Sequence, residues 1–546
     1  MPFLAQKRVP IPNKDILSWM FDEPKFDQEK PVYIDAIDPS RSISASQARV
    51  IIRKLAAGFH AAGVKSGDCV CVHSFNNVYY PMLFLGIIAA GAIFAGTNPA
   101  YTHFELAHHF KTSRTRFIIA EPDLLKAVVS AAQECGIPQS NVLAFNCHNE
   151  SIPAGFEPWG TLLEHGERDW IRFDDEQVSK KTTAARLFSS GTTGLPKAAA
   201  LSHYNLIAQH TLVNEIQPPP YEPRRLLYLP LFHAAMVPVA HVTPLRSGDS
   251  SYILRRFEME PFLTSIQKYQ LTEMVFVPPV AVAVLKYPSL HNYSLKSIKV
   301  VVCGAGPLDK EHQNALQSIL GSETSFTQVW GMTETSCVAS KFYYPERDDT
   351  GSVGRMMPNL DVKLIDDNGK DITAFDVPGE LCIRGPTIIS GYFNSSHATK
   401  DSIDGEGYFK TGDVMYCDSK TKKWYIIDRK KELIKVRGFQ VAPAEIEGVL
   451  LSHPQILDAA VIGVRKPDEP DVEMPKAFVV RKSGSDGAAL TEEMVKSFCG
   501  ERLAKYKELS AGVTFIDAIP RNATGKALKR ILRDMAKATT ANSARL

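Results

Sequence analysis

Short, uninterrupted apolar runs recur through most of the chain, and they constrain its fold more than any other feature. Examples are Phe117–Ala120, Met274–Val277 and Val300–Cys303, each separated from the next by longer amphipathic stretches. A continuous run of this length that is followed by Gly or Pro is typical of a strand buried on both faces of a parallel sheet. The alternation therefore predicts an α/β fold with parallel-rich sheets flanked by helices.

The chain is also too long for one ordinary domain, because 546 residues exceed what a single hydrophobic core usually organises. A strand passes into a cluster of charged residues at Asp428–Lys431, where we place a domain boundary. The following segment is mixed, with expected strands at Ala459–Val464 and Ala477–Val480. The prediction is a large N-terminal domain, 1–428, and a small α+β C-terminal domain, 429–546.

Composition excludes several classes of protein. Apolar residues make up 44% and charged residues 22%, and the formal net charge is only +2, so a nucleic-acid partner is not expected. The N-terminus has no apolar run typical of a signal peptide. The longest uncharged stretch, Pro81–Ala100, contains three glycines and is interrupted by Thr97 and Asn98. We therefore expect a buried helix running into a buried strand there, and no transmembrane segment.

Nine cysteines are scattered along the chain and none has CxxC spacing. Cys69 and Cys71 lie two residues apart in an apolar stretch, where alternation predicts one shared face of a strand. No companion metal ligands accompany them. Free thiols of an intracellular protein are the expectation.

A loop after an apolar run carries the strongest chemical signal. Glycines expose backbone N–H groups there, and hydroxyls and one ammonium add further donors, a combination typical of a phosphate cradle. The spacing of the two glycines and the missing Ser or Thr after the lysine exclude a Walker A loop. The residues that we expect to bind phosphate are Ser189, Ser190, Gly191, Thr192, Thr193, Gly194 and Lys197.

Two further segments suit a nucleotide site. The segment Gln328–Glu334 brings together an aromatic ring that can stack on a base, a hydroxyl that can bind phosphate and a carboxylate that can hold Mg²⁺. An Asp follows a Thr-Gly turn at Asp413, and such a carboxylate can accept both ribose hydroxyls. Each motif alone is also compatible with a solvated strand end or a simple turn. The residues singled out are Gln328, Trp330, Gly331, Thr333, Glu334 and Asp413.

A lysine after Thr-Gly, Lys526, completes an ordered set of four motifs that resembles the adenylate-forming superfamily of acyl-CoA synthetases, adenylation domains and luciferases. The resemblance covers nearly the whole chain and is closest to the ligases of the 4-coumarate–CoA ligase type. The segments that support it are Leu229–His233, Cys303–Leu308, Gly351–Arg355, Gly379–Gly385 and Lys431–Pro443.

The resemblance implies an ATP-dependent reaction in which a carboxylate attacks the α-phosphate to give acyl-AMP and pyrophosphate. Both reactants are anions, so cations and fixed donors aimed at the phosphorus oxygens should dominate catalysis. Lys526 would bridge the carboxylate and the α-phosphate. Thr333 would bind that phosphate, Glu334 would hold Mg²⁺, Asp413 and Arg429 would hold the ribose, and Trp330 would pack on the adenine.

The resemblance also implies a second half-reaction, in which the thiolate of coenzyme A displaces AMP. The small domain would rotate about a hinge near Lys430 and Lys431, remove Lys526 and bring Arg437 and Gly438 beside the pantetheine channel. Lys435 and Gln440 match positions near the adenylate phosphate.

Two departures from the family pattern, Ala198 and Val329, each replace a glycine, and Val329 is expected to reshape the acyl pocket. His233 would close that pocket and meet the incoming carboxylate. No acid lies in Phe232–Met236 to pair an α-ammonium, which would be costly to bury alone. Because Ala234 and its neighbours are small and apolar, we expect an aryl, arylalkenoic or medium-to-long aliphatic acid.

Alternatives remain at this stage. The enzyme could load a carrier protein in trans, act as a luciferase-like oxygenase, or be a degenerate binding protein, although its intact motif residues argue against the last. The sequence ends in Ala544-Arg545-Leu546, a variant of the Ser-Lys-Leu address, which predicts recognition by a peroxisomal import receptor, with a cytoplasmic location as the alternative.

Overall fold

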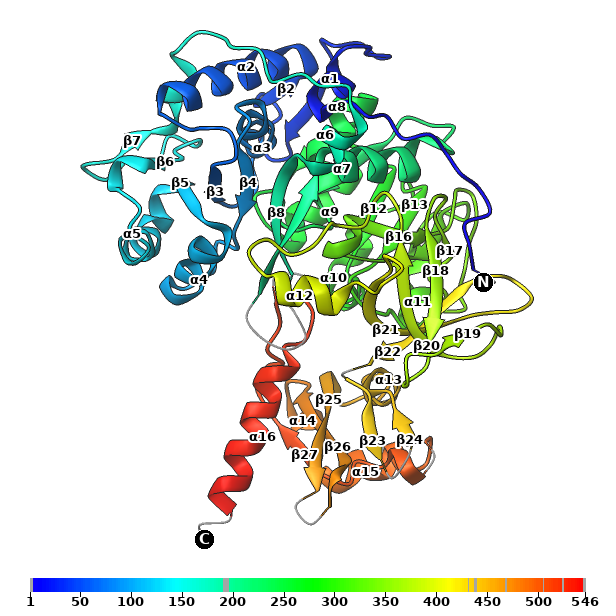
Figure 1. Cartoon of the computed structure of the whole chain (residues 1–546). Coiled ribbons are helices and arrows are strands. Elements are labelled where there is room, and N and C mark those ends of the chain that lie inside the picture. The colour runs from blue at the N-terminus through cyan, green and yellow to red at the C-terminus, as the bar shows by residue number, and fades with distance from the viewer. Residues whose placement is uncertain are drawn as a thin grey trace.

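The computed structural model describes residues 3–189, 196–430, 432–436, 439–466, 469–503, 505–522 and 525–543. Figure 1 shows a large body that holds the N-terminal part of the chain and a smaller unit below it that holds the C-terminal part. The final helix, α16 (Lys529–Ser543), packs on the smaller unit, where Leu532 and Ala536 are buried, and runs away from the body. The expected α/β architecture, with a smaller C-terminal unit, is confirmed.

Two mostly parallel sheets organise the body. The first has the order β7-β6-β5-β3-β4-β8-β9, and only the β8–β9 hairpin is antiparallel. All five residues of β3 are buried, as the apolar pattern of the sequence predicts. Its strands are β3 (Cys69–His73), β4 (Ile93–Gly96), β5 (Thr115–Ala120), β6 (Val142–Ala144), β7 (Glu157–Pro158), β8 (Thr183–Ser189) and β9 (Lys197–Ser202).

The second sheet has the order β14-β13-β12-β10-β11-β1-β2, again parallel except for one antiparallel edge pair. One continuous hydrophobic core serves both sheets. The strands are β1 (Pro31–Asp35), β2 (Ser42–Ser44), β10 (Arg224–Leu227), β11 (Ser250–Ile253), β12 (Glu273–Phe276), β13 (Val300–Cys303) and β14 (Ser325–Gln328).

Antiparallel strands follow in the chain and have a core of their own. One three-stranded sheet contains β15 (Trp330–Met332), β16 (Cys337–Lys341) and β17 (Arg355–Met356). A five-stranded sheet of order β19-β18-β20-β21-β22 contains β18 (Asp361–Ile365), β19 (Asp371–Ile372), β20 (Gly379–Arg384), β21 (Phe409–Cys417) and β22 (Trp424–Arg429).

The C-terminal unit has two small hydrophobic cores, one on either side of its sheet. Its strands are β23 (Ile434–Val436), β24 (Phe439–Val441), β25 (Ile456–Lys466), β26 (Glu469–Arg481) and β27 (Val513–Phe515). β25 and β26 contain the two strands that we expected in this segment. The first core begins at Ile434, five residues after β22 ends. The boundary at Asp428–Lys431 stays a prediction.

Helices cover the faces of the sheets (Figure 1). Several begin at the polar caps that helix chemistry favours, such as Ser44, whose hydroxyl and backbone N–H form a reciprocal pair with Gln47. The helices are α1 (Ile16–Phe21), α2 (Ala45–Ala61), α3 (Tyr80–Ala89), α4 (His103–Ser113), α5 (Leu125–Glu134), α6 (Glu176–Lys181), α7 (His203–His210), α8 (Thr243–Ser247), α9 (Met259–Lys268), α10 (Pro278–Leu285), α11 (Lys310–Ile319), α12 (Ser396–Ser402), α13 (Pro443–Leu451), α14 (Ser485–Ala488), α15 (Glu492–Gly500) and α16.

The uncharged stretch Pro81–Ala100 forms α3, which is entirely buried, and then the buried strand β4, as expected. Among the helices of the described residues, none combines the length and apolar character that a membrane crossing requires. All nine cysteines lie in the described part of the chain and all are free thiols.

Candidate active site

Three side chains that are distant in sequence meet where strand β15 approaches the five-stranded sheet. The indole Nε1 of Trp330 donates to Oδ2 of Asp413 at 2.8 Å, and Nε of Arg429 lies 3.1 Å from the other carboxylate oxygen. Asp413 and Arg429 are direct partners on neighbouring strands β21 and β22, so sheet register sets their spacing. Trp330 and Asp413 are about 5% exposed, which makes this a buried, charged network.

Acidic neighbours keep Arg429 charged. Burial alone would lower the pKa of its guanidinium, but the carboxylates of Asp413, Glu432 and Glu334 outweigh burial and raise that pKa above the ordinary value. The proposed metal ligand Glu334 is thus among the charges that act on Arg429. A fixed cation beside two carboxylates suits an anionic nucleotide that is bound through hydroxyls and through a metal ion.

Glu334 has a partner that the sequence did not indicate. The hydroxyl of Tyr392 donates to its Oε1 at 2.7 Å, and the ammonium of Lys197 lies 5.1 Å from the centre of the Tyr392 ring. Burial and the charge of Glu334 raise the pKa of Tyr392, so its hydroxyl remains a donor at neutral pH. Tyr392 thus connects the carboxylate that would hold a metal with the lysine of the phosphate loop.

The turn that carries Thr333 and Glu334 depends on a glycine. It is a short helical turn, Thr333–Thr335, and both residues are buried. A methyl group placed on Gly331, just before it, would lie 1.8 Å from the carbonyl oxygen of Cys337 on the adjacent strand β16. No side chain fits in that space, so the strand pairing that presents Thr333 requires glycine at this position.

The phosphate loop connects β8 and β9. Ser189 and Lys197 pair across the ends of these strands, and Ser190, Gly191, Thr192, Thr193 and Gly194 lie outside the described residues. Ala198, which replaces a glycine of the family pattern, lies in β9 rather than in the loop. It is buried, and its carbonyl accepts from the backbone N–H of Phe393 at 2.8 Å. Its methyl group is therefore packed inside the sheet.

Gln328 ends β14 and is occupied by its own neighbours. Its side-chain Oε1 accepts from the Leu308 backbone N–H at 3.0 Å. Its side-chain Nε2 donates to the Leu308 carbonyl at 2.8 Å and to Oε1 of Gln313 at 3.2 Å. These bonds anchor the Leu308 end of the Gly304–Leu308 segment to strand β14. Next to it, a Cγ of Val329 lies 3.1 Å from where a methyl group on Gly304 would be, so Val329 covers that glycine.

Lys526 lies at the same site. It lies in a narrow turn in which its backbone N–H donates to the side chain of Asn522 at 2.8 Å. Burial and the charge of Arg429 lower the pKa of its ammonium, while Glu432 and Asp413 oppose them. The structure therefore brings Lys526, Arg429 and Asp413 within electrostatic reach of one another.

The residues expected to act with coenzyme A lie elsewhere in the C-terminal unit. Lys435 and Gln440 are direct cross-strand partners on β23 and β24. Arg437 and Gly438 lie outside the described residues. Lys526 and the residues predicted to act with coenzyme A thus lie on different parts of the C-terminal unit.

His233 is neutral in this structure. Burial lowers its pKa to about 4, and its Nδ1 accepts from the backbone N–H of Ala235 at 3.2 Å. The carbonyl of Ala235 in turn accepts from the thiol of Cys337 at 3.5 Å, which ties the His233 loop to the strand after Glu334. A neutral imidazole can donate a hydrogen bond to a carboxylate without forming an ion pair.

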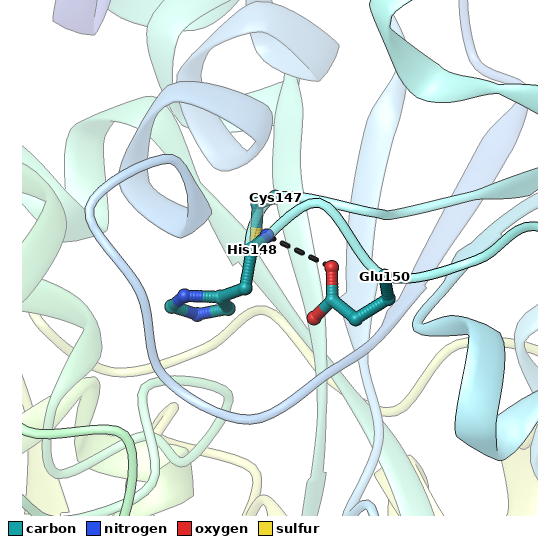
Figure 2. Close-up of side chains that lie close together, drawn as sticks. All are labelled: Cys147, His148 and Glu150. Atoms are coloured by element: carbon teal, nitrogen blue, oxygen red, sulfur yellow. Dashed lines mark hydrogen bonds between the residues drawn. The ribbon is translucent and has the colours of Figure 1, made fainter.

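A separate cluster of three side chains has the residue types of a metal site. Ligand atoms of Cys147, His148 and Glu150 lie within 4.8 Å of one another, and Figure 2 shows the three on one loop. The guanidinium of Arg41 contacts the Nδ1 of His148 and donates to the carbonyl of Cys147 at 2.8 Å. Burial raises the pKa of the Cys147 thiol to about 12. A cation would meet a guanidinium and a protonated thiol there, so we assign it no metal.

Comparison with known proteins agrees with this geometry. The family model of AMP-binding enzymes matches residues 22–393, and the model of the AMP-binding enzyme C-terminal domain matches residues 445–526. A phenylacetyl-CoA ligase from Aspergillus niger is 54% identical and the match covers 98% of this chain and 99% of that protein. An acyl-CoA ligase from another strain of A. niger is also 54% identical, with 97% of this chain and 100% of that protein covered.

Solved structures give the same result for the fold. ATP-bound MatB from Rhodopseudomonas palustris superposes with a TM-score of 0.82 at 25% identity, covering 96% of this chain and 99% of that one. The resemblance that the four motifs suggested is confirmed. The chain belongs to the family of AMP-binding enzymes.

Proposed function

We propose that the acid this enzyme activates is aromatic and of the phenylacetic type. The enzyme itself is an ATP-dependent acid–CoA ligase that works through an acyl-adenylate. The observation that carries the substrate proposal is the 54% identity, along almost the full length, to a protein named as a phenylacetyl-CoA ligase. Arylalkenoic and aliphatic acids are the alternatives.

The side chains next to His233 in the sequence favour an uncharged, apolar acyl group. Ala234 is buried, and the neighbouring carbonyl of Ala235 is held by the weak donor Cys337. Since no carboxylate stands in Phe232–Met236, an α-ammonium group would be buried there without a partner, at a cost of several kcal/mol. We propose that Val329, which covers Gly304, borders the acyl group as well.

The residues that meet around Asp413 have separate parts in adenylation. We propose that Asp413 and Arg429 hold the ribose and Trp330 packs on the adenine. Lys526 stabilises the charge that gathers on the α-phosphate when a carboxylate oxygen attacks phosphorus and pyrophosphate leaves. Two unit charges 4 Å apart interact by roughly 4 kcal/mol at an effective dielectric of 20, so Lys526 contributes more to the reaction than any single neutral donor.

We propose that Glu334 binds Mg²⁺, whose charge would neutralise part of the triphosphate. The donor set fits a hard cation, because Glu334 is a buried carboxylate and Tyr392 occupies only its Oε1. Tyr392 orients the carboxylate through its hydrogen bond to Oε1, as partners of metal ligands commonly do. In the second half-reaction, the sulfur of coenzyme A attacks the acyl carbon and AMP departs with the bridging oxygen.

A panel of acids tests the substrate class. Phenylacetic, 4-hydroxycinnamic and octanoic acids would each be supplied with MgATP and coenzyme A, and kcat/KM for acyl-CoA formation compared. 3-Phenylpropionic acid and phenylalanine form a matched pair that differs only by the α-ammonium. We expect phenylacetic acid to lead and phenylalanine to be inert. Faster turnover of the aliphatic acid would contradict the proposal.

Import into peroxisomes is also a proposal, and it rests on Ala544-Arg545-Leu546, which lie outside the described residues. A receptor needs an accessible tail, and α16 projects from the body just before this segment (Figure 1). A fluorescent protein fused to the N-terminus should be punctate with the tripeptide present and diffuse without it. Puncta that persist after the deletion would contradict the proposal.

A further inference from the structure

The C-terminal unit meets the body along helix α10, at two separate points. At the N-terminal end of the helix, the backbone of Gly525 packs on Pro279 so closely that a methyl group on Gly525 would lie 2.6 Å from the proline ring. Just past the other end, the ammonium of Lys286 donates to the carbonyl of Leu457 at 3.3 Å. Seven residues of helix separate the contacts by about 10 Å.

The two contact points are joined inside the C-terminal unit by an ion pair. Leu457 precedes Asp458, whose carboxylate receives Nη2 of Arg521 at 2.7 Å and Nε at 3.2 Å. The same guanidinium donates through Nη1 to the carbonyl of Gly525 at 2.6 Å. Arg521 therefore links the strand that contacts Lys286 with the glycine that contacts Pro279.

This linkage controls the turn that carries Lys526. Arg521 and Ala527 pair across the turn as an isolated antiparallel bridge. Inside it, Asn522 and Lys526 exchange hydrogen bonds, of 2.9 Å from the Asn522 backbone N–H and 2.8 Å to its side chain. The Asp458–Arg521 pair is less than a third exposed on either side, so solvent screens it only in part. The pair therefore fixes Arg521 at the base of the turn.

α10 also touches the nucleotide side of the site. Pro278, its first residue, lies 3.7 Å from where a methyl group on Gly306 would be, in the segment that Gln328 holds. One rigid helix thus contacts both a loop of the active site and the turn that supplies Lys526.

We propose that α10 is the docking helix for adenylation and that Asp458, Arg521 and Lys286 are positioning residues for Lys526. None of the three needs to touch substrate. They set where the ammonium stands when the carboxylate attacks the α-phosphate. The inference rests on the proposed role of Lys526, and it requires that their loss slow adenylation and spare acyl transfer to coenzyme A, in which Lys526 takes no part.

The test measures the two half-reactions separately on the full-length enzyme. Adenylation is followed as acid-dependent pyrophosphate release in a single turnover without coenzyme A. Acyl transfer is followed as acyl-CoA formed from synthetic phenylacetyl-AMP and coenzyme A without ATP. The variants are Asp458→Asn, which keeps shape and removes charge, and Lys286→Met, which removes the ammonium from the body side. Glu501→Gln is the matched control, because it breaks the exposed Arg502–Glu501 pair of the same unit.

We expect each variant to slow adenylation by about tenfold, equivalent to about 1.4 kcal/mol of activation free energy, while acyl transfer and the control stay at the parental rate. Equal slowing of both half-reactions would overturn the proposal, since it would indicate a general structural role. Unchanged adenylation in Lys286→Met would overturn it too, even if Asp458→Asn failed to fold. A parent enzyme that released no pyrophosphate would instead refute the proposed function.

Discussion

Replacing Asp413 with Asn tests the nucleotide site most sharply, because one atom changes and the shape is kept. Asp413 is buried, and its two oxygens receive the Trp330 indole and Arg429. The Asn oxygen can still accept from the indole. Its NH₂ group would face the guanidinium of Arg429. Both groups are hydrogen-bond donors, so neither would have an acceptor there.

The size of the effect follows from the bonds that lose their charge. A hydrogen bond to a charged acceptor contributes about 1.5–3 kcal/mol and one to a neutral acceptor roughly half of that. If each oxygen of Asp413 accepts one ribose hydroxyl, Asp413→Asn weakens one bond by about 1 kcal/mol and removes the acceptor of the other, at a further cost of at least about 1 kcal/mol. The sum of about 2 kcal/mol corresponds to an increase of about thirtyfold in the Kd for ATP.

Isothermal titration with ATP and thermal unfolding would be measured on the parent and on Asp413→Asn. Asp418→Asn is a suitable control, because Asp418 immediately follows the same strand β21 but is only half-buried and caps a turn through Thr421. We expect weaker ATP binding only in Asp413→Asn, together with a lower Tm, since Arg429 loses its strongest partner. Parental affinity for ATP in Asp413→Asn would show that this carboxylate does not hold the nucleotide.

Three further predictions follow from the site. Lys526→Ala should slow acid-dependent pyrophosphate release by on the order of a hundredfold. In the parent enzyme, the rate of release should fall as pH rises through the pKa of Lys526, which lies below the ordinary 10.5, since only the charged ammonium acts. A rate that is sustained at pH values above this pKa would refute the assignment. Gly331→Ala should lower Tm and abolish adenylation, because its methyl group would meet the Cys337 carbonyl, and a fully active variant would contradict the packing. Tyr392→Phe should raise the Mg²⁺ concentration needed for half-maximal rate by about tenfold, and an unchanged Mg²⁺ dependence would exclude Tyr392 as the orienting partner of Glu334.

Much of the fold follows from local patterns. Apolar runs such as Val300–Cys303 became parallel strands because no polar side chain interrupts them, although in this strand only Val301 and Cys303 are fully buried. Motif order also indicated Trp330 and Asp413 separately, although they are 83 residues apart. Their direct hydrogen bond was not predictable, since it depends on how β15 approaches β21 in three dimensions.

The remaining contacts had no local signal. Tyr392 is a single tyrosine outside every motif, and only the fold brings its hydroxyl to Glu334. The polar partners of Gln328 are backbone groups of Leu308, which a sequence pattern does not reveal. The same holds for Lys286 and Leu457, whose contact spans 171 residues and joins the two parts of the molecule.

In the reaction that we propose, a carboxylate oxygen becomes bonded to the α-phosphate before coenzyme A reacts. Phenylacetic acid labelled in both carboxylate oxygens with a heavy isotope would be turned over with MgATP and coenzyme A, and the AMP analysed by mass spectrometry. The account predicts that each AMP released carries one labelled oxygen, because the acyl carbon–oxygen bond breaks when sulfur attacks. Unlabelled AMP, or label found in inorganic phosphate together with ADP, would contradict it.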